Sequence, residues 1–350
     1  MKKLLVILLA LLMVSGCSNK PSTTAEAPKE LKIEFVPSKD ADVIITATEG
    51  LDKLLIDAMA KKGYNLDKVT VSVGTSYEAT GESLAAGSID LGWLPGGTYA
   101  LYSKDVDVIL TAQRKGLSND SEQAKDWNGE ANKTLKNGDP VTFYRSLVYA
   151  APTEKGKAIA AKVNAGEKLT WDDVKDATWG IQKTSSSAGY IYPTMWLMDN
   201  FDGKKLTDLP HATLVEGGYG SAFANAAAGN LDIIVCYADG RNDYEKAWNL
   251  PIDKKDDTGK QGMGREKSIW EELNVIGVTD KIYNDTVAIT KAKEGVHNPK
   301  FIEALQDSLI EIIHTEAGKK MFEVYSHSDY AKATDKDYDG ARKALEAVKN

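Results

Sequence analysis

Residues 178–193 read TWGIQKTSSSAGYIYP, which predicts a strand, a hydroxyl-rich turn and a helix in that order. The strand ends at Gln182, the turn runs from Thr184 to Ser187, and the helix contains Pro193 near its start. A helix N-terminus exposes unpaired backbone N–H groups and carries about half a positive charge. Together with the hydroxyls, this favours binding of a tetrahedral oxyanion, although a solvated Ser/Thr linker with a helix cap would have the same sequence pattern.

Strands and helices also alternate upstream of this turn. Strand-like segments at 31–36, 68–73 and 89–94 are separated by helical periodicity over 51–59 and 77–86. Such alternation is typical of parallel sheets whose faces are covered by helices. The sequence therefore predicts an α/β fold built on mainly parallel sheets.

The pattern around the helix at 77–86 occurs a second time. Residues 72–90 read SVGTSYEATGESLAAGSID, and residues 214–232 read LVEGGYGSAFANAAAGNLD, which pairs Tyr77 with Tyr219. Ligands of open α/β sheets bind beyond the carboxyl ends of strands, so both phenols are candidate ligand contacts. The repeat favours two similar lobes, and chance similarity between short β-α-β units is the alternative.

Length, charge and cysteine content limit the classes of function. At 350 residues the chain is longer than one compact core usually holds, which again favours two lobes. The net charge of −8 argues against a nucleic-acid partner, but a small anion can still bind to backbone N–H groups. The four histidines lack metal-ligand spacing, and neither a nucleophile elbow nor a P-loop occurs, so we expect no metal and no cofactor. Cys236 lies in an apolar run and is expected to be a buried side chain rather than a nucleophile.

The first residues are typical of an exported lipoprotein. Two lysines precede an apolar run from Leu4 to Val14, which is shorter than the roughly 18 apolar residues of a membrane-spanning helix. The following Ser-Gly-Cys17 resembles the lipobox of bacterial lipoproteins, in which the signal peptide, here residues 1–16, is removed and the cysteine is acylated. An ordinary signal peptide with an incidental cysteine is the alternative. Residues 17–30 would then be a flexible tether, and the protein would be anchored by lipid outside the cytoplasmic membrane.

Three short stretches resemble one known family. FVPS at 35–38, GSIDLGW at 87–93 and SSAGYIYP at 186–193 are similar to the periplasmic phosphonate-, phosphite- and phosphate-binding proteins of ABC transporters. The last stretch is the specific one, because many solute-binding proteins share the other two. The resemblance extends over most of residues 31–330.

This resemblance implies the two-lobed, type II periplasmic-binding-protein fold. Each lobe would be a mainly parallel sheet flanked by helices, and two crossing strands near 148–152 and 283–288 would join the lobes. Lobe 1 would comprise residues 31–148 and 286–350, and lobe 2 residues 149–285. We expect such a protein to act as a monomer that delivers its ligand to an ABC permease.

The resemblance also implies a set of ligand contacts. In the family, the Ser-rich turn holds phosphonate oxygens through hydroxyl and backbone N–H groups, and aromatic residues add further contacts. The matching positions here are Ser185, Ser186, Ser187, Tyr77, Tyr144 and Tyr219. Tyr219 stands where some members have a histidine, which removes one cation and favours a different preferred anion.

Two aspartates, Asp239 and Asp285, match family carboxylates that hold the amino group of an aminoalkylphosphonate. A carboxylate repels an oxyanion unless a proton or an ammonium group lies between them. The pair therefore favours a zwitterionic phosphonate. Two alternatives stay open: one carboxylate accepts a hydrogen bond from a protonated phosphate or phosphite, or each aspartate is a solvated turn residue. The polar excursions 116–138 and 250–268 would line the cleft or contact the permease.

The sequence thus predicts a lipid-anchored receptor for a phosphorus oxyanion, which makes and breaks no bond. The same architecture would suit a sulfonate, a thiamine precursor or another small anion. Two alternatives come from other classes: an exported enzyme that uses Asp239 and Asp285 as acid and base, and a structural surface lipoprotein. The lack of a nucleophile, metal-ligand set or activated histidine argues against the enzyme.

Overall fold

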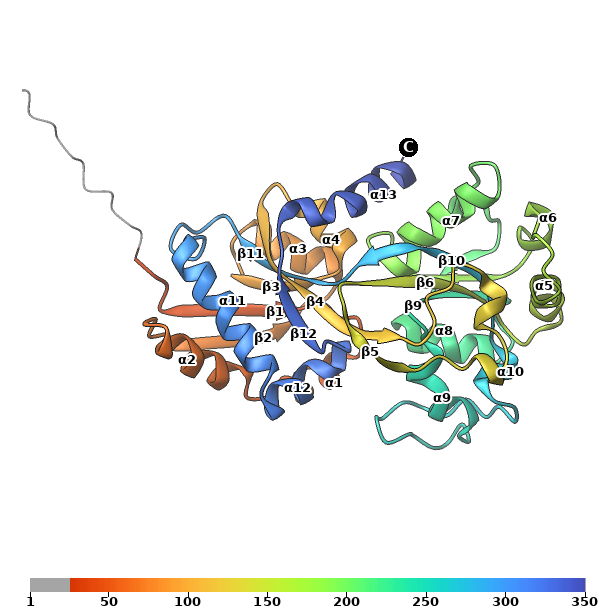
Figure 1. The fold of residues 1–350 in the computed structure, drawn as a ribbon, viewed down its shortest axis with the longest axis horizontal. Helices are drawn as coiled ribbons and strands as arrows, with labels where there is room; N and C mark the ends of the chain where they lie inside the picture. The colour runs from red at the N-terminus through yellow and green to blue at the C-terminus, as the bar shows by residue number, and fades with distance from the viewer. Residues whose placement is uncertain (1–25, 350) are drawn as a thin grey trace, which may run out of the picture.

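The computed structural model describes residues 26–349, so the predicted signal peptide, Cys17 and most of the predicted tether lie outside the described residues. Two β-sheets lie side by side along the long axis of the molecule, and helices pack against both (Figure 1). The first sheet has the strand order β12-β4-β11-β3-β1-β2, with β5 paired to β4, and the second has the order β10-β6-β9-β7-β8. The predicted two-lobed α/β fold is confirmed.

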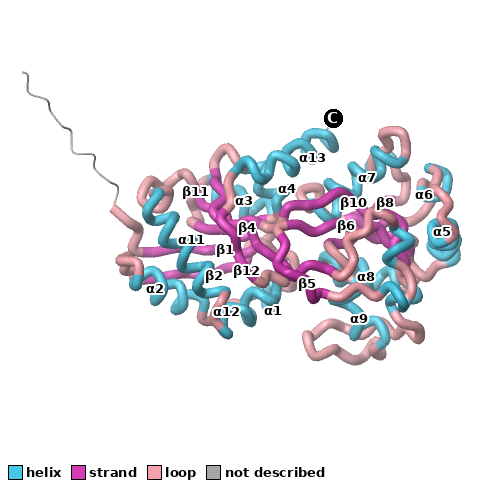
Figure 2. Tube along the Cα trace, in the orientation of Figure 1, coloured by secondary structure: helices cyan, strands magenta, loops and turns pink. Residues whose placement is uncertain are grey.

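The strands alternate with helices along most of the chain (Figure 2). The first sheet contains β1 (Glu30–Phe35), β2 (Lys68–Val73), β3 (Leu91–Leu94), β4 (Val106–Leu117), β5 (Lys136–Val141), β11 (Thr286–Thr290) and β12 (Asp329–Lys332). The second contains β6 (Phe143–Ala150), β7 (Trp179–Ile181), β8 (Ala212–Leu214), β9 (Ile233–Tyr237) and β10 (Asn274–Tyr283).

The helices divide between the two sheets. Those of the first sheet are α1 (Ala41–Ala47), α2 (Leu51–Lys61), α3 (Tyr77–Ala85), α4 (Gly96–Tyr102), α11 (Pro299–Ile313), α12 (Glu316–Phe322) and α13 (Asp339–Lys349). Those of the second are α5 (Glu154–Asn164), α6 (Trp171–Val174), α7 (Tyr192–Asn200), α8 (Gly218–Ala227), α9 (Arg241–Asn249) and α10 (Ile269–Glu272).

The parallel pairing that alternation predicts is found in part of each sheet. Strand β1 is parallel to β2 and β3, and β7 is parallel to β8 and β9. The two strands that follow the passages between the lobes, β6 and β11, are antiparallel to their neighbours. Strand β11 is antiparallel to β3 and β4, and β6 is antiparallel to β9 and β10. Each sheet is therefore mixed, with three parallel strands beside the antiparallel ones.

The chain passes between the sheets twice. It enters the second sheet at Thr142, between β5 and β6, and returns at Asn284 and Asp285, between β10 and β11. The segment between β4 and β5 already packs on the second lobe, where Trp127 joins a buried cluster with residues of β6 and β9. The return lies within the predicted crossing at 283–288. The outward passage comes before the expected 148–152 stretch, because β6 is hydrogen-bonded along its length to β9 and β10 of the second sheet.

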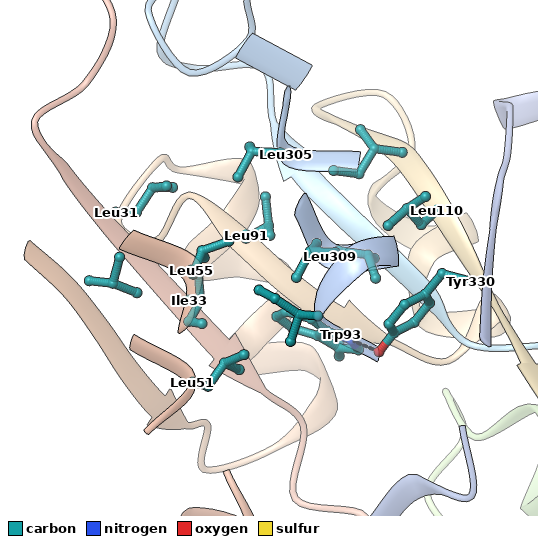
Figure 3. Packing of buried hydrophobic residues seen from close by; sticks show 14 of the residues in the cluster. Leu31, Ile33, Leu51, Leu55, Leu91, Trp93, Leu110, Leu305, Leu309 and Tyr330 are labelled. Atoms are coloured by element: carbon teal, nitrogen blue, oxygen red, sulfur yellow. Dashed lines mark hydrogen bonds between the residues drawn. The ribbon is translucent and has the colours of Figure 1, made fainter. Parts of the chain in front are cut away.

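A buried cluster under α2 and α11 fixes the first lobe (Figure 3). Alternate residues of β1, Leu31, Ile33 and Phe35, are buried, as expected for a strand with one face on the core. Leu305 and Leu309 of α11 lie four residues apart and share one face of that helix, where both are fully buried. The apolar periodicity of the sequence thus positions β1, whose C-terminal end leads into the site.

The last helix, α13, contacts both lobes. It packs against α4 in the first lobe and against α7 and β10 in the second. Ala341 and Leu345 of α13 belong to the same buried cluster as Ala188 and Ile191 from the Ser-rich turn. In Figure 1, α13 lies along the upper side of the molecule, whereas α1 and α9 lie along the lower side.

Candidate functional site

A cavity of about 60 Å³ lies between the two sheets and is lined by residues of both. This is far below the roughly 300–1,000 Å³ of pockets that hold drug-sized ligands. Its polar lining comes from Ser38, Lys39, Tyr77, Arg114, Asp285, Tyr325, Ser326 and His327 on the first-lobe side, and from Tyr144, Ser186, Ser187, Tyr219 and Tyr237 on the other. The dimensions suit one small ion.

Most of the predicted site residues meet in this cavity. Those that line it are Tyr77, Tyr144, Ser186, Ser187, Tyr219 and Asp285. The tyrosines of the sequence repeat, Tyr77 and Tyr219, enter from opposite lobes, one at the start of α3 and one in α8. Ser185 and Asp239 are not among the lining residues.

The Ser-rich turn presents free donors at the cavity. Ser186 caps the π-helical turn Ser187–Ile191, its Oγ accepts a hydrogen bond from the backbone N–H of Gly189 at 3.1 Å, and it lies 3.2 Å from the phenol oxygen of Tyr219. The backbone N–H groups of Ser187 and Ala188 have no hydrogen-bond partner within residues 26–349. Such unpaired groups at a helix start are suited to an anion.

The same turn closes the lobes on one another. Ser185 Oγ donates to Glu78 Oε1 at 2.6 Å, and Ser187 Oγ accepts from the backbone N–H of Gly97 at 2.9 Å. A Cβ atom on Gly97 would lie 2.6 Å from Ile191 Cδ1 and 2.9 Å from Ser187 Oγ, so only glycine permits this approach. Ser185 therefore serves a contact between the lobes, and Ser187 serves both that contact and the cavity wall.

Two cations in the cavity wall were missed by the sequence reasoning. Arg114 of β4 donates from Nη2 to Asp285 Oδ2 at 2.7 Å, and its guanidinium carbon lies 4.9 Å from the centre of the Tyr144 ring. Its Nε is buried and has no hydrogen-bond partner in the described part of the chain. Lys39, between β1 and α1, is largely buried, and burial lowers its pKa even though Asp243 opposes the shift. Both side chains supply positive charge to the cavity.

Asp285 is the carboxylate of the cavity, and His327 is its second partner. His327 Nε2 lies 3.3 Å from Asp285 Oδ2. Burial alone would raise the pKa of Asp285, but Arg114 and His327 outweigh it and hold that pKa below its ordinary value. Burial, together with the charges of Arg114 and Lys39, lowers the pKa of His327 despite the opposing effect of Asp285, so the imidazole is neutral at neutral pH.

The phenols of the cavity are neutral hydrogen-bond donors. Burial raises the pKa of Tyr77, Tyr144 and Tyr219, and nearby Asp285 adds to the shift for the first two. A protonated phenol can donate one hydrogen bond while its ring supplies an apolar wall.

Asp239 lies in a separate, fully buried ion pair. Its two oxygens accept hydrogen bonds from Arg241 Nε at 2.9 Å and Arg241 Nη2 at 2.7 Å. The Arg241 guanidinium also donates to the carbonyls of Trp127 and Leu273 and lies over the Trp270 ring. This carboxylate is thus satisfied inside the second lobe. In the sequence, the arginine two residues after Asp239 was the one sign that this carboxylate is paired within the lobe.

Other kinds of site find no support in residues 26–349. No cluster of three or more His, Cys, Asp or Glu side chains there could hold a metal ion. Cys236 is fully buried in β9, and burial raises the pKa of its thiol, as expected for a packing residue rather than a nucleophile. None of the helices in this range combines the length and the apolar character required to cross a bilayer.

Two mixed sheets, two chain passages and a small cavity between them define a type II periplasmic binding protein. Solved structures share this fold. A binding-protein component of a phosphonate ABC transporter from Pseudomonas aeruginosa is 13% identical with a TM-score of 0.58, over 91% of this chain and 85% of that one. PhnD1 from Prochlorococcus marinus, in complex with methylphosphonate, is 17% identical with a TM-score of 0.58, over 92% and 99%. A Xanthomonas citri protein bound to chloride is 11% identical with a TM-score of 0.61, over 92% and 98%.

The comparison with protein families identifies the chain more narrowly than the fold does. Residues 33–338 match the family described as the periplasmic substrate-binding protein of phosphonate ABC transporters, and the chain belongs to this family. Its members are extracytoplasmic solute-binding components of transporters rather than enzymes, and they imply a permease partner and a small ligand. The predicted class of protein is confirmed.

Proposed function

We propose that this protein binds a small phosphorus oxyanion in the cavity between its lobes and delivers it to an ABC permease. The observation that carries the proposal is the donor set, in which Arg114, Lys39, the Ser186 hydroxyl and the free N–H groups of Ser187 and Ala188 converge on one small space. Charge-assisted hydrogen bonds from such donors complement the oxygens of a phosphonate, phosphite or phosphate.

The size and walls of the cavity support a compact ligand. A volume of about 60 Å³ in the closed arrangement of the lobes favours a compact ion over the ring system of a thiamine precursor. Val36, Leu94 and Pro95 add apolar surface to the lining, against which a P–H hydrogen or a short alkyl group can pack. Phosphite and methylphosphonate have this combination of oxygens and one apolar substituent.

The contacts of the two aspartates argue against an aminoalkylphosphonate. Asp239 is bonded through both oxygens to Arg241, and the charge of Asp285 is balanced by Arg114. An ammonium group would therefore find no carboxylate with an unbalanced charge, and it would meet the positive charge of Lys39. We place phosphite, methylphosphonate and phosphate ahead of 2-aminoethylphosphonate.

Isothermal titration calorimetry on the delipidated protein tests the proposal directly. We expect heat of binding with at least one of methylphosphonate, phosphite and phosphate, and weaker binding of 2-aminoethylphosphonate. If none of the four ligands binds, the phosphorus assignment is wrong.

A matched pair of serine variants locates the site. Ser186→Ala removes a hydroxyl at the cavity and should weaken the preferred ligand by about 1–3 kcal/mol. Ser103→Ala removes a hydroxyl that bonds only within the α4 end, to the Ala100 carbonyl, and should leave affinity unchanged. Equal affinities for the two variants would move the binding site away from the Ser-rich turn.

We also propose that the mature chain is a monomer that begins at Cys17 and is held at the membrane by acyl chains. The support is the order of residues before Cys17, with a lysine pair, an apolar run and Ser-Gly. Expression in a bacterial host should give an acylated N-terminal peptide by mass spectrometry, and Cys17→Ser should abolish acylation. Light scattering of the delipidated protein should give the monomer mass.

A further inference from the structure

The C-terminal segment connects the two lobes on the upper side of the molecule (Figure 1). It consists of the 3₁₀ turn Asp335–Tyr338 and α13. Helix α13 packs against α4 of the first lobe and against α7, β10 and the π-helical turn Ser187–Ile191 of the second. These contacts are additional to the chain passages at Thr142 and Asn284, and they are noncovalent, so they can form and break as the lobes move.

Tyr338 attaches this segment to the point where the two passages meet. Its hydroxyl donates to the carbonyl oxygen of Asn284 at 2.8 Å, and it lies 3.0 Å from Thr111 Oγ1. A carbonyl only accepts, so the phenol hydrogen belongs to Asn284 and the Thr111 hydroxyl donates to the phenol oxygen. Asn284 in turn donates to the first passage, from its backbone N–H to the carbonyl of Thr142 and from Nδ2 to that of Val141, both at 2.8 Å. One buried phenol is therefore bonded to the residue that joins both passages.

The ring of Tyr338 packs against both lobes beside the passages. Its centroid lies 5.1 Å from that of Tyr99 in α4 and 5.1 Å from that of Tyr283 at the end of β10, both in edge-on contact. A Cβ atom on Gly96 would lie 3.1 Å from two carbons of the ring, which is closer than an ordinary contact. Burial raises the pKa of Tyr338, so its hydroxyl stays protonated and can donate. The side chain is thus fixed by both its hydroxyl and its ring.

The apolar face of α13 is buried between the lobes. Ala341, Ala344 and Leu345 are three or four residues apart and so share one face of the helix, and each is 8% exposed or less. They belong to one buried cluster with Ile191 and Ile282 of the second lobe and with residues of α3, α4 and β4 of the first. Separating the lobes at this point would expose apolar surface to water, which is unfavourable.

We propose that the C-terminal segment 335–349 is a brace that holds the lobes in their closed arrangement, and that it sets ligand affinity without touching the ligand. None of its residues lines the cavity. When the binding-competent form is only partly populated, the apparent dissociation constant is the intrinsic one divided by the populated fraction. A looser brace lowers the closed fraction, so every ligand of the cavity should weaken by the same factor. A residue that contacts the ligand would instead change the affinities of different ligands unequally.

This inference rests on the proposed function only where it concerns ligand affinity, because the shape of the ligand-free protein reports on closure directly. Leu345→Ala removes apolar contact between α13 and the cluster. Small-angle X-ray scattering should show a larger radius of gyration for the ligand-free variant than for the unmodified protein. Calorimetry should show methylphosphonate and phosphate weakened about 3- to 30-fold, by factors that agree within about twofold. Saturating ligand should return the variant to the radius of the unmodified protein.

Glu346→Ala changes the next residue of α13, which is exposed, and should leave both the radius and the affinities unchanged. A folded Leu345→Ala protein with the radius and the affinities of this control would overturn the brace. Absence of binding for methylphosphonate, phosphite and phosphate would instead overturn the proposed function, and the scattering of the ligand-free proteins would still decide whether the brace exists.

Tyr338→Phe provides a milder second variant in case Leu345→Ala does not fold. It keeps the ring packing and leaves the buried carbonyl of Asn284 without its donor, so affinity should fall about 2- to 10-fold with the same scattering signature. Tyr64→Phe is the matched control, because that ring packs against Phe301 within the first lobe. Equal radii and equal affinities for the two phenylalanine variants would remove Tyr338 from the brace. Circular dichroism verifies that each variant is folded.

Discussion

The Asp239–Arg241 pair inside the second lobe and the Asp285–Arg114 pair in the cavity share a closest N–O distance of 2.7 Å. Their surroundings differ. Both side chains of the first pair are 0% exposed, and both oxygens of Asp239 are bonded to the arginine. The side chains of the second pair are 14% and 15% exposed, and Oδ1 of Asp285 accepts no hydrogen bond from residues 26–349. The first pair has its hydrogen-bonding capacity filled by the protein, and the second retains capacity for a ligand.

Removing one member of the fully buried pair should have the largest effect. Asp239→Asn leaves Arg241 buried without its counter-charge, which should lower the free energy of unfolding by about 3–5 kcal/mol. Urea unfolding followed by circular dichroism measures the loss. Asp285→Asn should cost clearly less, because Arg114 borders the cavity and can be hydrated there. If the two variants lose the same stability, the distinction between the pairs is wrong.

Removing the cavity arginine should act on binding more than on stability. Arg114→Met keeps an aliphatic stem over Tyr144 but removes the charge, and should weaken ligand binding by about 10- to 100-fold. Titration calorimetry with the preferred ligand measures this change. Arg342→Met, in a surface ion pair of α13, is the control and should bind as tightly as the unmodified protein. Unchanged affinity in Arg114→Met would show that the arginine only neutralises Asp285.

A variant of Gly97 tests lobe closure, on which the cavity pair should depend and the pair inside the second lobe should not. Gly97→Ala places a Cβ atom within 3.0 Å of three atoms across the lobe contact, so it should hinder closure and weaken ligand binding by about 1–3 kcal/mol. The Asp239 pair lies within one lobe and should be unaffected, so the urea midpoint should change little. Gly340→Ala, whose Cβ would meet no atom within 4 Å, is the matched control. Equal ligand affinities for the two alanine variants would remove the role of the Gly97 contact.

The smallest expected effect concerns acid stability. The pKa of Asp285 is lower in the folded protein than its ordinary value. Between these two pKa values the unfolded chain binds more protons than the folded protein, so the free energy of unfolding falls as the pH drops through this interval. Asp285→Asn should remove this contribution and flatten the decline in unfolding free energy below about pH 4. Unfolding curves at several acidic pH values measure it. An unchanged slope would mean that Asp285 is not held in its ionised form.

Much of the fold and part of the site could be predicted from local sequence. The alternation over 31–94 predicted strands and helices correctly, because periodicity is a local property. The hydroxyl-rich turn placed Ser186 at a helix cap, where it borders the cavity. Arg114 and His327 escaped notice because the pairing of β4, β11 and β12 brings them to the cavity from distant parts of the chain.

The two aspartates show the same limit. Both were singled out because they match the same family feature. One is bonded to an arginine two residues away, and the other to an arginine 171 residues away. Only the Asp285–Arg114 contact depends on how distant strands pair, and of the two aspartates only Asp285 reaches the cavity.

The position of α13 has a practical consequence for building an optical sensor from this protein. Because α13 contacts both lobes on one side, we expect the lobes to separate most on the other side, where α1 and α9 lie. Val43 of α1 is exposed, so Val43→Cys would place a dye on the moving side, and buried Cys236 would not compete for the reagent. A surface tether at the C-terminus, next to α13, would leave that side free to move.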